Sequence, residues 1–308
     1  MAPKVSILMA AYNAGQTIAE TIECLLSQTF TDFELVVVDD GSTDTTKEIV
    51  DSFAQTDKRV KYIWQKNARH PAARNRGLQV CIGKYVAIID ADDLWTADKL
   101  ARQMELMQDE DDLIVLTGNT IFYEENGERV WGHSTFPPPT KGDRYTVFDI
   151  LMVQLNQMAM FNTGLIPKEV LIRLGGYNEE ILTAEDWELW LKTVVECRFK
   201  VIEEPLMFYR KHAQSYTSGT DLYVTLLAHE EIIFNQYRWK YISKKELAAA
   251  LFARRIDTCA IYLYRKDLLR SMMTLGRSLR ILRCWHEREL WLRMSEVIRL
   301  AFKKTVEI

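Results

Sequence analysis

Three carboxylates follow a short apolar run near residue 90. Residues 85 to 89 read YVAII, the pattern of a buried strand, and Asp90, Asp92 and Asp93 come directly after it. Carboxylates at this spacing repel one another unless a positive group balances them. Mg²⁺ and Mn²⁺ prefer oxygen ligands, and one or two carboxylates suffice where substrate phosphates complete the shell. The pattern therefore predicts either a metal site that neutralises a departing diphosphate or a solvated acidic turn that caps the next helix.

A second acidic segment, Asp39 to Asp44, reads DDGSTD and follows another apolar run. A carboxylate at its start could accept a hydrogen bond from a nucleobase or a ribose. The same string is also typical of a glycine turn followed by a helix N-cap. A third apolar run leads into Ala11, Tyr12 and Asn13. Polar groups thus follow three separate runs of strand length.

The elements that must position these residues alternate along the chain. Strand-like runs occupy residues 5–9, 33–38, 60–64, 85–89 and 113–116. Helical spacing of apolar residues occurs between most of them and again at about 184–195. Such alternation predicts an α/β fold with a mostly parallel sheet covered on both faces. We expect the polar segments to meet at the carboxyl edge of that sheet, where ligands of such folds bind.

Seven motifs occur in a characteristic order along the first two-thirds of the chain. They read ILMAAYN, VVVDDGSTD, AARNRG, YVAIIDADD, GGYNEE, AEDWELWLK and YRKH. Together they resemble the family 2 glycosyltransferases of bacterial type, which have the GT-A fold. The resemblance implies a Rossmann-like, mostly parallel sheet flanked by helices, with a C-terminal helical appendage outside the match. Ala10 and Ala11 stand where the family commonly has Pro-Thr, and the segment 67–71 lacks the usual glycine.

The resemblance also implies roles for individual residues. Asp186 matches the general base of inverting members, although it could simply charge the start of a helix. His212 lies where some relatives bring a histidine to the metal or diphosphate, although a lone histidine is more often a surface or packed residue. Nucleotide-sugar contacts are expected from Ala11, Tyr12, Asn13, Asp39, Arg74, Asp90 and Ala91, and metal ligation from Asp92 and His212.

The expected activity is transfer of a hexosyl group with inversion. The donor would be a nucleoside diphosphate sugar, first of all a UDP-sugar, and the acceptor a hydroxyl of a saccharide or a lipid-linked glycan in polysaccharide biosynthesis. Mn²⁺ or Mg²⁺ would serve as the cofactor. Two alternatives remain open: a catalytically silent nucleotide-sugar binding protein, and a nucleotidyltransferase or phosphohydrolase with the same acidic strand ends.

The 308 residues predict a catalytic domain at 1–220 and a helical region at 221–308. Within the domain, about 1–120 would bind the nucleotide sugar and about 121–220 the acceptor. Residues 241–308 contain 15 Lys and Arg against 7 Asp and Glu, a net +8. These basic helices either pack on the domain or lie on an anionic membrane surface. No groove-reading motif accompanies the charge, so nucleic acid is not an expected partner.

Composition and hydropathy predict where in the cell the protein is located. It is 48% hydrophobic and 27% charged, which is typical of an ordered globular chain. No apolar run reaches the length of a membrane span, and the N-terminus does not read as a signal peptide. Five cysteines without a CxxC pair argue against a disulfide framework and against a thiolate zinc site. The expected location is cytoplasmic, with the inner face of the membrane as a possible peripheral site.

Overall fold

The computed structural model describes residues 2–107, 110–124, 133–135, 139, 142–146, 163–181, 185–211, 243 and 246. The elements below all belong to one compact unit, Met1–Tyr145 with Gln157–Glu231. The expected helical region 221–308 lies outside the described residues apart from Ser243 and Glu246. Among the described residues, no helix combines the length and the hydrophobicity that a membrane crossing requires.

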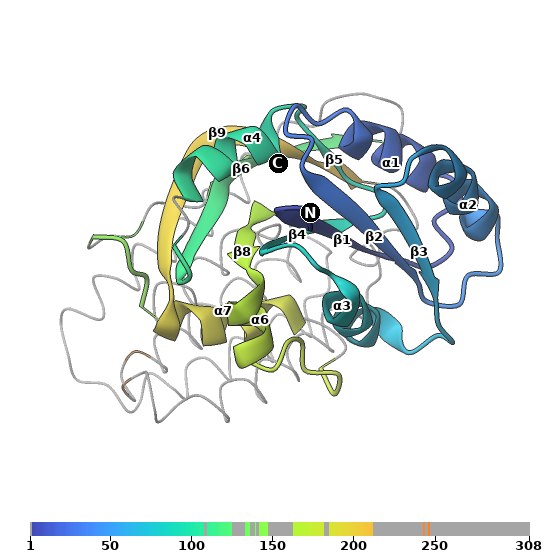
Figure 1. The fold of residues 1–308 in the computed structure, drawn as a ribbon. Coiled ribbons are helices and arrows are strands. Elements are labelled where there is room, and N and C mark those ends of the chain that lie inside the picture. Colours follow the sequence, from blue (N-terminus) through green and yellow to red (C-terminus); the bar gives the residue numbers. More distant parts are fainter. Residues whose placement is uncertain are drawn as a thin grey trace, which may run out of the picture. The chain divides into compact units, whose positions relative to one another are not determined.

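A nine-stranded mixed sheet forms the centre of this unit (Figure 1). The strand order is β3-β2-β1-β4-β8-β6-β9-β5, and β7 pairs with β6. The strands are β1 Val5–Ala11, β2 Phe33–Asp39, β3 Val60–Trp64, β4 Tyr85–Asp90, β5 Leu94–Trp95, β6 Leu113–Glu124, β7 His133–Thr135, β8 Leu165–Pro167 and β9 Arg198–Lys211.

The first four strands of the sheet are parallel and in register at their carboxyl ends. Ala11 of β1 pairs with Asp39 of β2, and Ala10 pairs with Asp90 of β4. The chain leaves β1 toward β2 and β3 on one side and returns to β4 on the other. A doubly wound sheet binds its ligands at such a switch point. The α/β fold is therefore confirmed, and the three polar segments do lie along one edge.

The helices cover both faces of the parallel strands (Figure 1). On α1, buried side chains recur at the spacing of one helical face, at Ile18, Thr21, Ile22 and Leu25. This face packs on the sheet together with α2 and α4, while α3 packs on the opposite side. The helices are α1 Ile18–Leu26, α2 Thr46–Thr56, α3 Arg69–Val80, α4 Lys99–Met107, α6 Lys168–Arg173 and α7 Glu185–Glu196.

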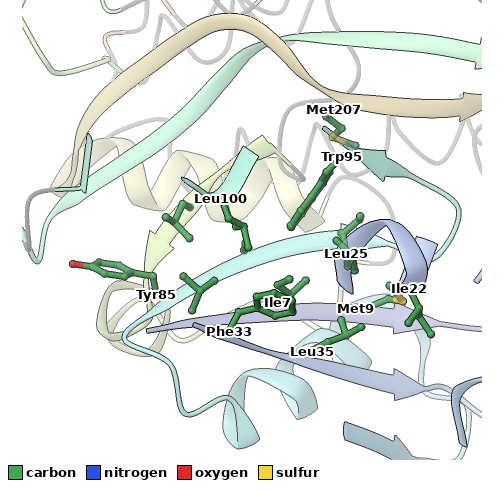
Figure 2. Close-up of a cluster of buried hydrophobic side chains, with 14 of the residues drawn as sticks. Ile7, Met9, Ile22, Leu25, Phe33, Leu35, Tyr85, Trp95, Leu100 and Met207 are labelled. Carbon is green, nitrogen blue, oxygen red and sulfur yellow. The ribbon is translucent and has the colours of Figure 1, made fainter. Parts of the chain in front are cut away.

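Alternate strand residues build a hydrophobic core on the α1 side of the sheet (Figure 2). Ile7 and Met9 of β1 and Leu35 of β2 point into it and meet the apolar face of α1. Trp95 and Met207 extend the same core toward β5 and β9. The N-terminal strands and the distant β9 are thus held by one continuous core.

A glycine brings α3 unusually close to the other face of the sheet. A Cβ built on Gly77 would lie 2.0 Å from Leu8 Cδ1 and 3.0 Å from Val38 Cγ2. No larger residue fits at this position without displacing β1 or α3. The close contact fixes the depth of α3, and therefore the position of Arg74, which lies nearly one turn earlier on the same helix.

Lys99 is a fully buried lysine at the start of α4. Its Nζ donates to Gln103 Oε1 at 2.9 Å and lies 3.9 Å from the centroid of the Trp95 ring. Gln103 in turn donates through Nε2 to the carbonyl oxygens of Val115 and Thr163, both at 2.8 Å. Burial disfavours the charged amine and lowers the pKa of Lys99 to about 7.

This lysine should make the stability of the protein depend on pH. Because its pKa is lower in the folded than in the unfolded chain, the unfolded chain binds more protons between pH 7 and about 10. The free energy of unfolding should therefore rise with pH across that window. In Lys99→Met the increase in the free energy of unfolding with pH should be smaller by about 1 kcal/mol per pH unit. Urea unfolding at several pH values measures it, with Leu100→Met as the non-titrating control, and equal slopes for Lys99→Met and the wild type would disprove the assignment.

Candidate active site

The carboxyl ends of β1, β2 and β4 bring together most of the residues that the sequence singled out. Ala11 ends β1 and is buried, whereas Tyr12 directly after it is exposed over 49% of its surface. Asn13 has a positive φ of 50°, and its Oδ1 accepts a hydrogen bond from the Thr43 N–H at 2.8 Å. Its own N–H donates to Ser42 Oγ at 2.9 Å. The segments after β1 and β2 are therefore tied to each other.

Two acidic residues at the end of β2 are turned inward. Asp39 is 1% exposed, and its oxygens accept hydrogen bonds from the Ser42 N–H at 2.8 Å and from Tyr62 Oη at 2.7 Å. Asp40 accepts from the backbone N–H groups of Ala68 and Arg69, both at 2.8 Å. It therefore caps the start of α3. The DDGSTD segment forms the glycine turn that its pattern predicts, with Gly41 at a φ of 81°, and the Thr46 N–H donates to Asp44 Oδ1 at 3.0 Å at the start of α2. The contact of Asp39 with a nucleobase or a ribose stays a prediction.

The loop after β4 is held through two backbone carbonyls and through the buried side chain of Asp93. The Ala91 carbonyl accepts hydrogen bonds from the hydroxyls of Thr17 at 2.9 Å and Thr21 at 3.1 Å; Thr17 directly precedes α1, and Thr21 lies on it. Arg210 of β9 donates through Nε to the Asp92 carbonyl at 2.9 Å. Its backbone N–H donates to Asp93 Oδ1 at 3.1 Å. Elements more than a hundred residues apart in sequence thus fix this loop.

Buried arginines supply the positive charge that the acidic cluster requires. Arg210 is 7% exposed and pairs with Glu20 of α1. Arg74 of α3 is 6% exposed and makes two ion pairs, each at 2.8 Å: Nη2 with Asp90 Oδ1 and Nη1 with Glu185 Oε1. Asp90 ends β4, and Glu185 begins α7 next to Asp186. One guanidinium therefore joins the acidic end of the strand to the acidic start of the helix.

Burial and neighbouring charges shift the pKa values of this cluster. Burial raises the pKa of Glu185, and nearby Asp186 raises it further, against the opposing effect of Arg74. Burial alone would lower the pKa of Arg74, but Asp90 and the other acidic groups around it raise it instead. Arg74 thus stays charged at any physiological pH. Strongly perturbed carboxyl groups of this kind are typical of functional sites.

The residues present fit a divalent cation only if the substrate supplies some of its ligands. The described residues contain no group of three His, Cys, Asp or Glu side chains that could hold a metal by themselves. Asp90 and Asp92 are partly exposed, whereas Asp93 is fully buried and directed at Arg210. Two carboxylates one residue apart suit Mg²⁺ or Mn²⁺ when substrate phosphates supply the remaining ligands. His212, the other expected ligand, lies outside the described residues.

Several residues that build the site were not singled out from the sequence. Arg210, Thr17, Thr21 and Glu20 hold the loop after β4, and Tyr177 stacks on Arg74 with 5.3 Å between its ring centroid and the guanidinium carbon. The only signal available was the need for positive charge near the three aspartates. Asp186 lies in the first turn of α7 and is partly exposed, as expected from its motif.

Comparison with known proteins agrees with this geometry. The chain is 28% identical over 252 residues to the uncharacterized glycosyltransferase MJ1057 of Methanocaldococcus jannaschii, which covers 77% of this chain and 84% of that protein. It is 34% identical over 124 residues to the putative teichuronic acid biosynthesis glycosyltransferase TuaG of Bacillus subtilis, over 40% of this chain and 49% of TuaG.

Solved structures share the fold. TarS 1–349 of S. aureus in complex with UDP-GlcNAc gives a TM-score of 0.64 at 20% identity, covering 90% of this chain and 81% of that one. The mannosyltransferase PcManGT of Pyrobaculum calidifontis in complex with GDP-Man and Mn²⁺ gives 0.58 at 18% identity, covering 99% and 88%. The model of the family named "Glycosyl transferase family 2" matches residues 6–168, which include the first three strand ends and the acidic loop. The chain therefore belongs to glycosyl transferase family 2.

Proposed function

We propose that this glycosyltransferase is metal-dependent and inverting, and that it moves a hexosyl group from a nucleoside diphosphate sugar to a hydroxyl. A UDP-sugar is the first choice of donor, and a saccharide or lipid-linked glycan is the acceptor. The observation that carries the proposal is that Arg74 forms ion pairs with two acidic segments. One is Asp90, at the end of the strand proposed to face the donor, and the other is Glu185, which directly precedes the proposed base Asp186. The complexes of the two structural neighbours with UDP-GlcNAc and GDP-Man support a nucleotide-sugar donor.

In the proposed reaction Asp186 acts as the general base. Its carboxylate takes the proton of the acceptor hydroxyl while the oxygen forms a bond to the anomeric carbon. The bond from that carbon to the diphosphate breaks on the opposite side, and its electron pair leaves with the nucleoside diphosphate. The anomeric configuration is therefore inverted. Asp186 lies in the first turn of α7, where the helix dipole favours a charged carboxylate.

The donor would lie along the edge formed by β1, β2 and β4. We place the nucleoside against Tyr12, the exposed aromatic side chain after β1, with Ala11, Asn13 and Asp39 around it. Asp92, with Asp90 and Ala91 beside it, would hold Mn²⁺ or Mg²⁺ next to the diphosphate, and His212 would join them. Bound there, the cation would neutralise charge on the departing diphosphate.

Calorimetric titration tests the donor assignment. UDP, GDP and dTDP are titrated into the purified protein with Mn²⁺ and again with EDTA. Binding of one nucleotide only in the presence of metal is expected, and it would identify the donor class. Product analysis then separates the reaction types. Glycosyl transfer from the matching sugar nucleotide, or its hydrolysis, releases a nucleoside diphosphate, whereas nucleotidyl transfer from a nucleoside triphosphate to a sugar phosphate releases pyrophosphate. Metal-independent binding would contradict the cofactor assignment.

Arg210 should matter for nucleotide binding although it is not expected to touch the nucleotide. In Arg210→Met, the Asp92 carbonyl loses its hydrogen bond and Glu20 loses its ion pair. The loop that carries Asp92 should loosen, and Mn²⁺-dependent affinity for the nucleotide should fall about tenfold. Calorimetry measures this, with Arg102→Met as the control because its ion pair with Glu204 is exposed. Unchanged affinity in Arg210→Met would disprove a role in positioning the loop.

Residues 241–308 carry a separate proposal, since they lie almost entirely outside the described residues. We propose that this basic segment, which the sequence predicts to be helical, contacts anionic lipid, which would bring the site to a lipid-linked acceptor. Co-sedimentation with vesicles containing phosphatidylglycerol, at low and at high salt, tests the proposal. Absence of salt-sensitive binding would favour packing of these helices on the catalytic domain.

A further inference from the structure

Arg74 joins three segments that are distant in sequence. Its guanidinium contacts Asp90, 16 residues away, and Glu185, 111 residues away. The ring of Tyr177 lies against the same guanidinium. The contacts with Tyr177 and Glu185 are shielded from water, because Arg74 and Tyr177 are almost fully buried and the Glu185 side chain is only 12% exposed. The Asp90 side chain is 29% exposed.

The residue next to Arg74 ties down the same region by other means. Asn75 Nδ2 donates to the Tyr177 carbonyl, and Asn75 Oδ1 accepts from the Tyr177 N–H, both at 2.9 Å. Gly176 allows this close approach, since its φ is +66° and a Cβ there would lie 2.5 Å from Asn75 Oδ1. Consecutive residues of α3 therefore hold the turn before α7 and the start of α7 itself.

We infer that Arg74 is a positioning residue for the proposed transfer reaction, not a ligand of the diphosphate. It would hold the start of α7, and with it Asp186, in a fixed position relative to Asp90 at the end of β4. Both terminal nitrogens of Arg74 already donate to carboxylates. A phosphate could replace these carboxylates only by leaving buried Glu185 without its ion pair, which is strongly unfavourable. This inference rests on the proposed function, because it gives Arg74 the task of positioning the proposed base.

Loss of Arg74 should affect turnover more than nucleotide binding. Displacing a reacting group by about 1 Å can lower turnover about 100-fold. The acidic limb of the pH profile should also move. Without the guanidinium, the buried carboxyl group of Glu185 and the neighbouring carboxyl group of Asp186 lose the positive charge that Arg74 supplies. Their mutual repulsion favours the protonated forms, so a higher pH is needed to ionise the base.

The test compares Arg74→Met and Arg74→Lys with the wild type. Turnover is followed as release of UDP from UDP-GlcNAc and of GDP from GDP-mannose with Mn²⁺, and affinity for UDP and GDP is measured by calorimetry. Arg74→Met should lower kcat about 100-fold with less than about a threefold change in nucleotide affinity. Its acidic limb should shift upward by about one pH unit. Arg74→Lys keeps the positive charge but not the two parallel N–H donors of the guanidinium. It should therefore keep the acidic limb of the pH profile at its wild-type position but retain only part of the wild-type kcat.

A control variant and the contrary outcomes complete the test of Arg74. Arg173→Met removes an exposed ion pair with Glu196 on α7 and should behave as the wild type. Weaker nucleotide binding in Arg74→Lys with kcat retained would overturn the inference and make Arg74 a donor ligand. Turnover in Arg74→Met equal to that of the wild type would overturn the inference alone, whereas a wild-type protein that binds none of UDP, GDP and dTDP would overturn the proposed function as well. If Arg74→Met does not fold, the kcat, the nucleotide affinity and the pH profile of Arg74→Lys test the inference instead.

Discussion

Asp186→Asn should abolish sugar transfer and leave nucleotide binding intact. Asparagine keeps the size of the side chain and a hydrogen-bonding oxygen but cannot accept the proton of the acceptor hydroxyl. Loss of a general base lowers turnover by about 10² to 10⁴-fold. Release of UDP or GDP from the corresponding sugar nucleotide measures the effect, and calorimetry with the free nucleotide shows whether the donor side is unaffected.

The matched control for this variant is at the other end of the same helix. Glu196→Gln removes a carboxylate from α7 that makes an exposed ion pair with Arg173, far along the helix from the cluster around Arg74. It should turn over at the wild-type rate. Full activity in Asp186→Asn would show that another group is the base. A joint loss of activity and nucleotide binding would instead indicate that Asp186 supports the donor side.

Asp92→Ala should remove the metal dependence of nucleotide binding. If Asp92 ligates the cation, its loss leaves Asp90 alone to hold it, and Asp90 is already engaged with Arg74. We expect nucleotide affinity with Mn²⁺ to fall about 100-fold, to the value measured with EDTA, a loss of about 2.7 kcal/mol. Titration of the nucleotide with and without Mn²⁺ measures both values.

Asp111→Ala is the control for that variant, because Asp111 is a largely exposed carboxylate whose ion pair with Lys84 lies on the surface. It should retain metal-dependent binding. The thermal stability of Asp92→Ala should stay close to that of the wild type, since the loop is held through its backbone by Thr17, Thr21 and Arg210. Wild-type, metal-dependent affinity in Asp92→Ala would refute the assignment of Asp92.

Local patterns predicted the parallel half of the fold. Runs of β-branched residues gave the first four strands to within one or two residues, and the register of Ala11 with Asp39 and of Ala10 with Asp90 confirms that their ends meet. The helix at about 184–195 is confirmed as α7. These elements are decided by their own periodicity, so the sequence alone is sufficient to find them.

Other elements depend on partners far away in the chain. The helix α3 has no clear apolar stripe, because Arg74 and Gly77 on its buried face meet charged groups and a close strand instead of a hydrophobic layer. Of strand β9, only the last residues belong to a recognisable motif, YRKH, which continues to His212. The hydrogen bonds from Arg210 to the acidic loop join residues that are 118 and 117 positions apart. Nothing in the local sequence of either segment specifies those partners. The balancing charge was therefore expected, but not the residues that supply it.

The order of elements along the chain has a consequence for how the protein acquires activity during synthesis. The strands that would face the nucleoside are complete once Asp90 has left the ribosome, and domains begin to fold from the N-terminus. Glu185 and Arg210 emerge much later. Until then Arg74 has Asp90 but not Glu185 as a partner, and the loop after β4 has Thr17 and Thr21 but not Arg210. A nascent chain with its first four strands formed would thus have the acidic residues but not the arrangement that holds them. Activity should appear only after β9 has joined the sheet, late in synthesis and all at once.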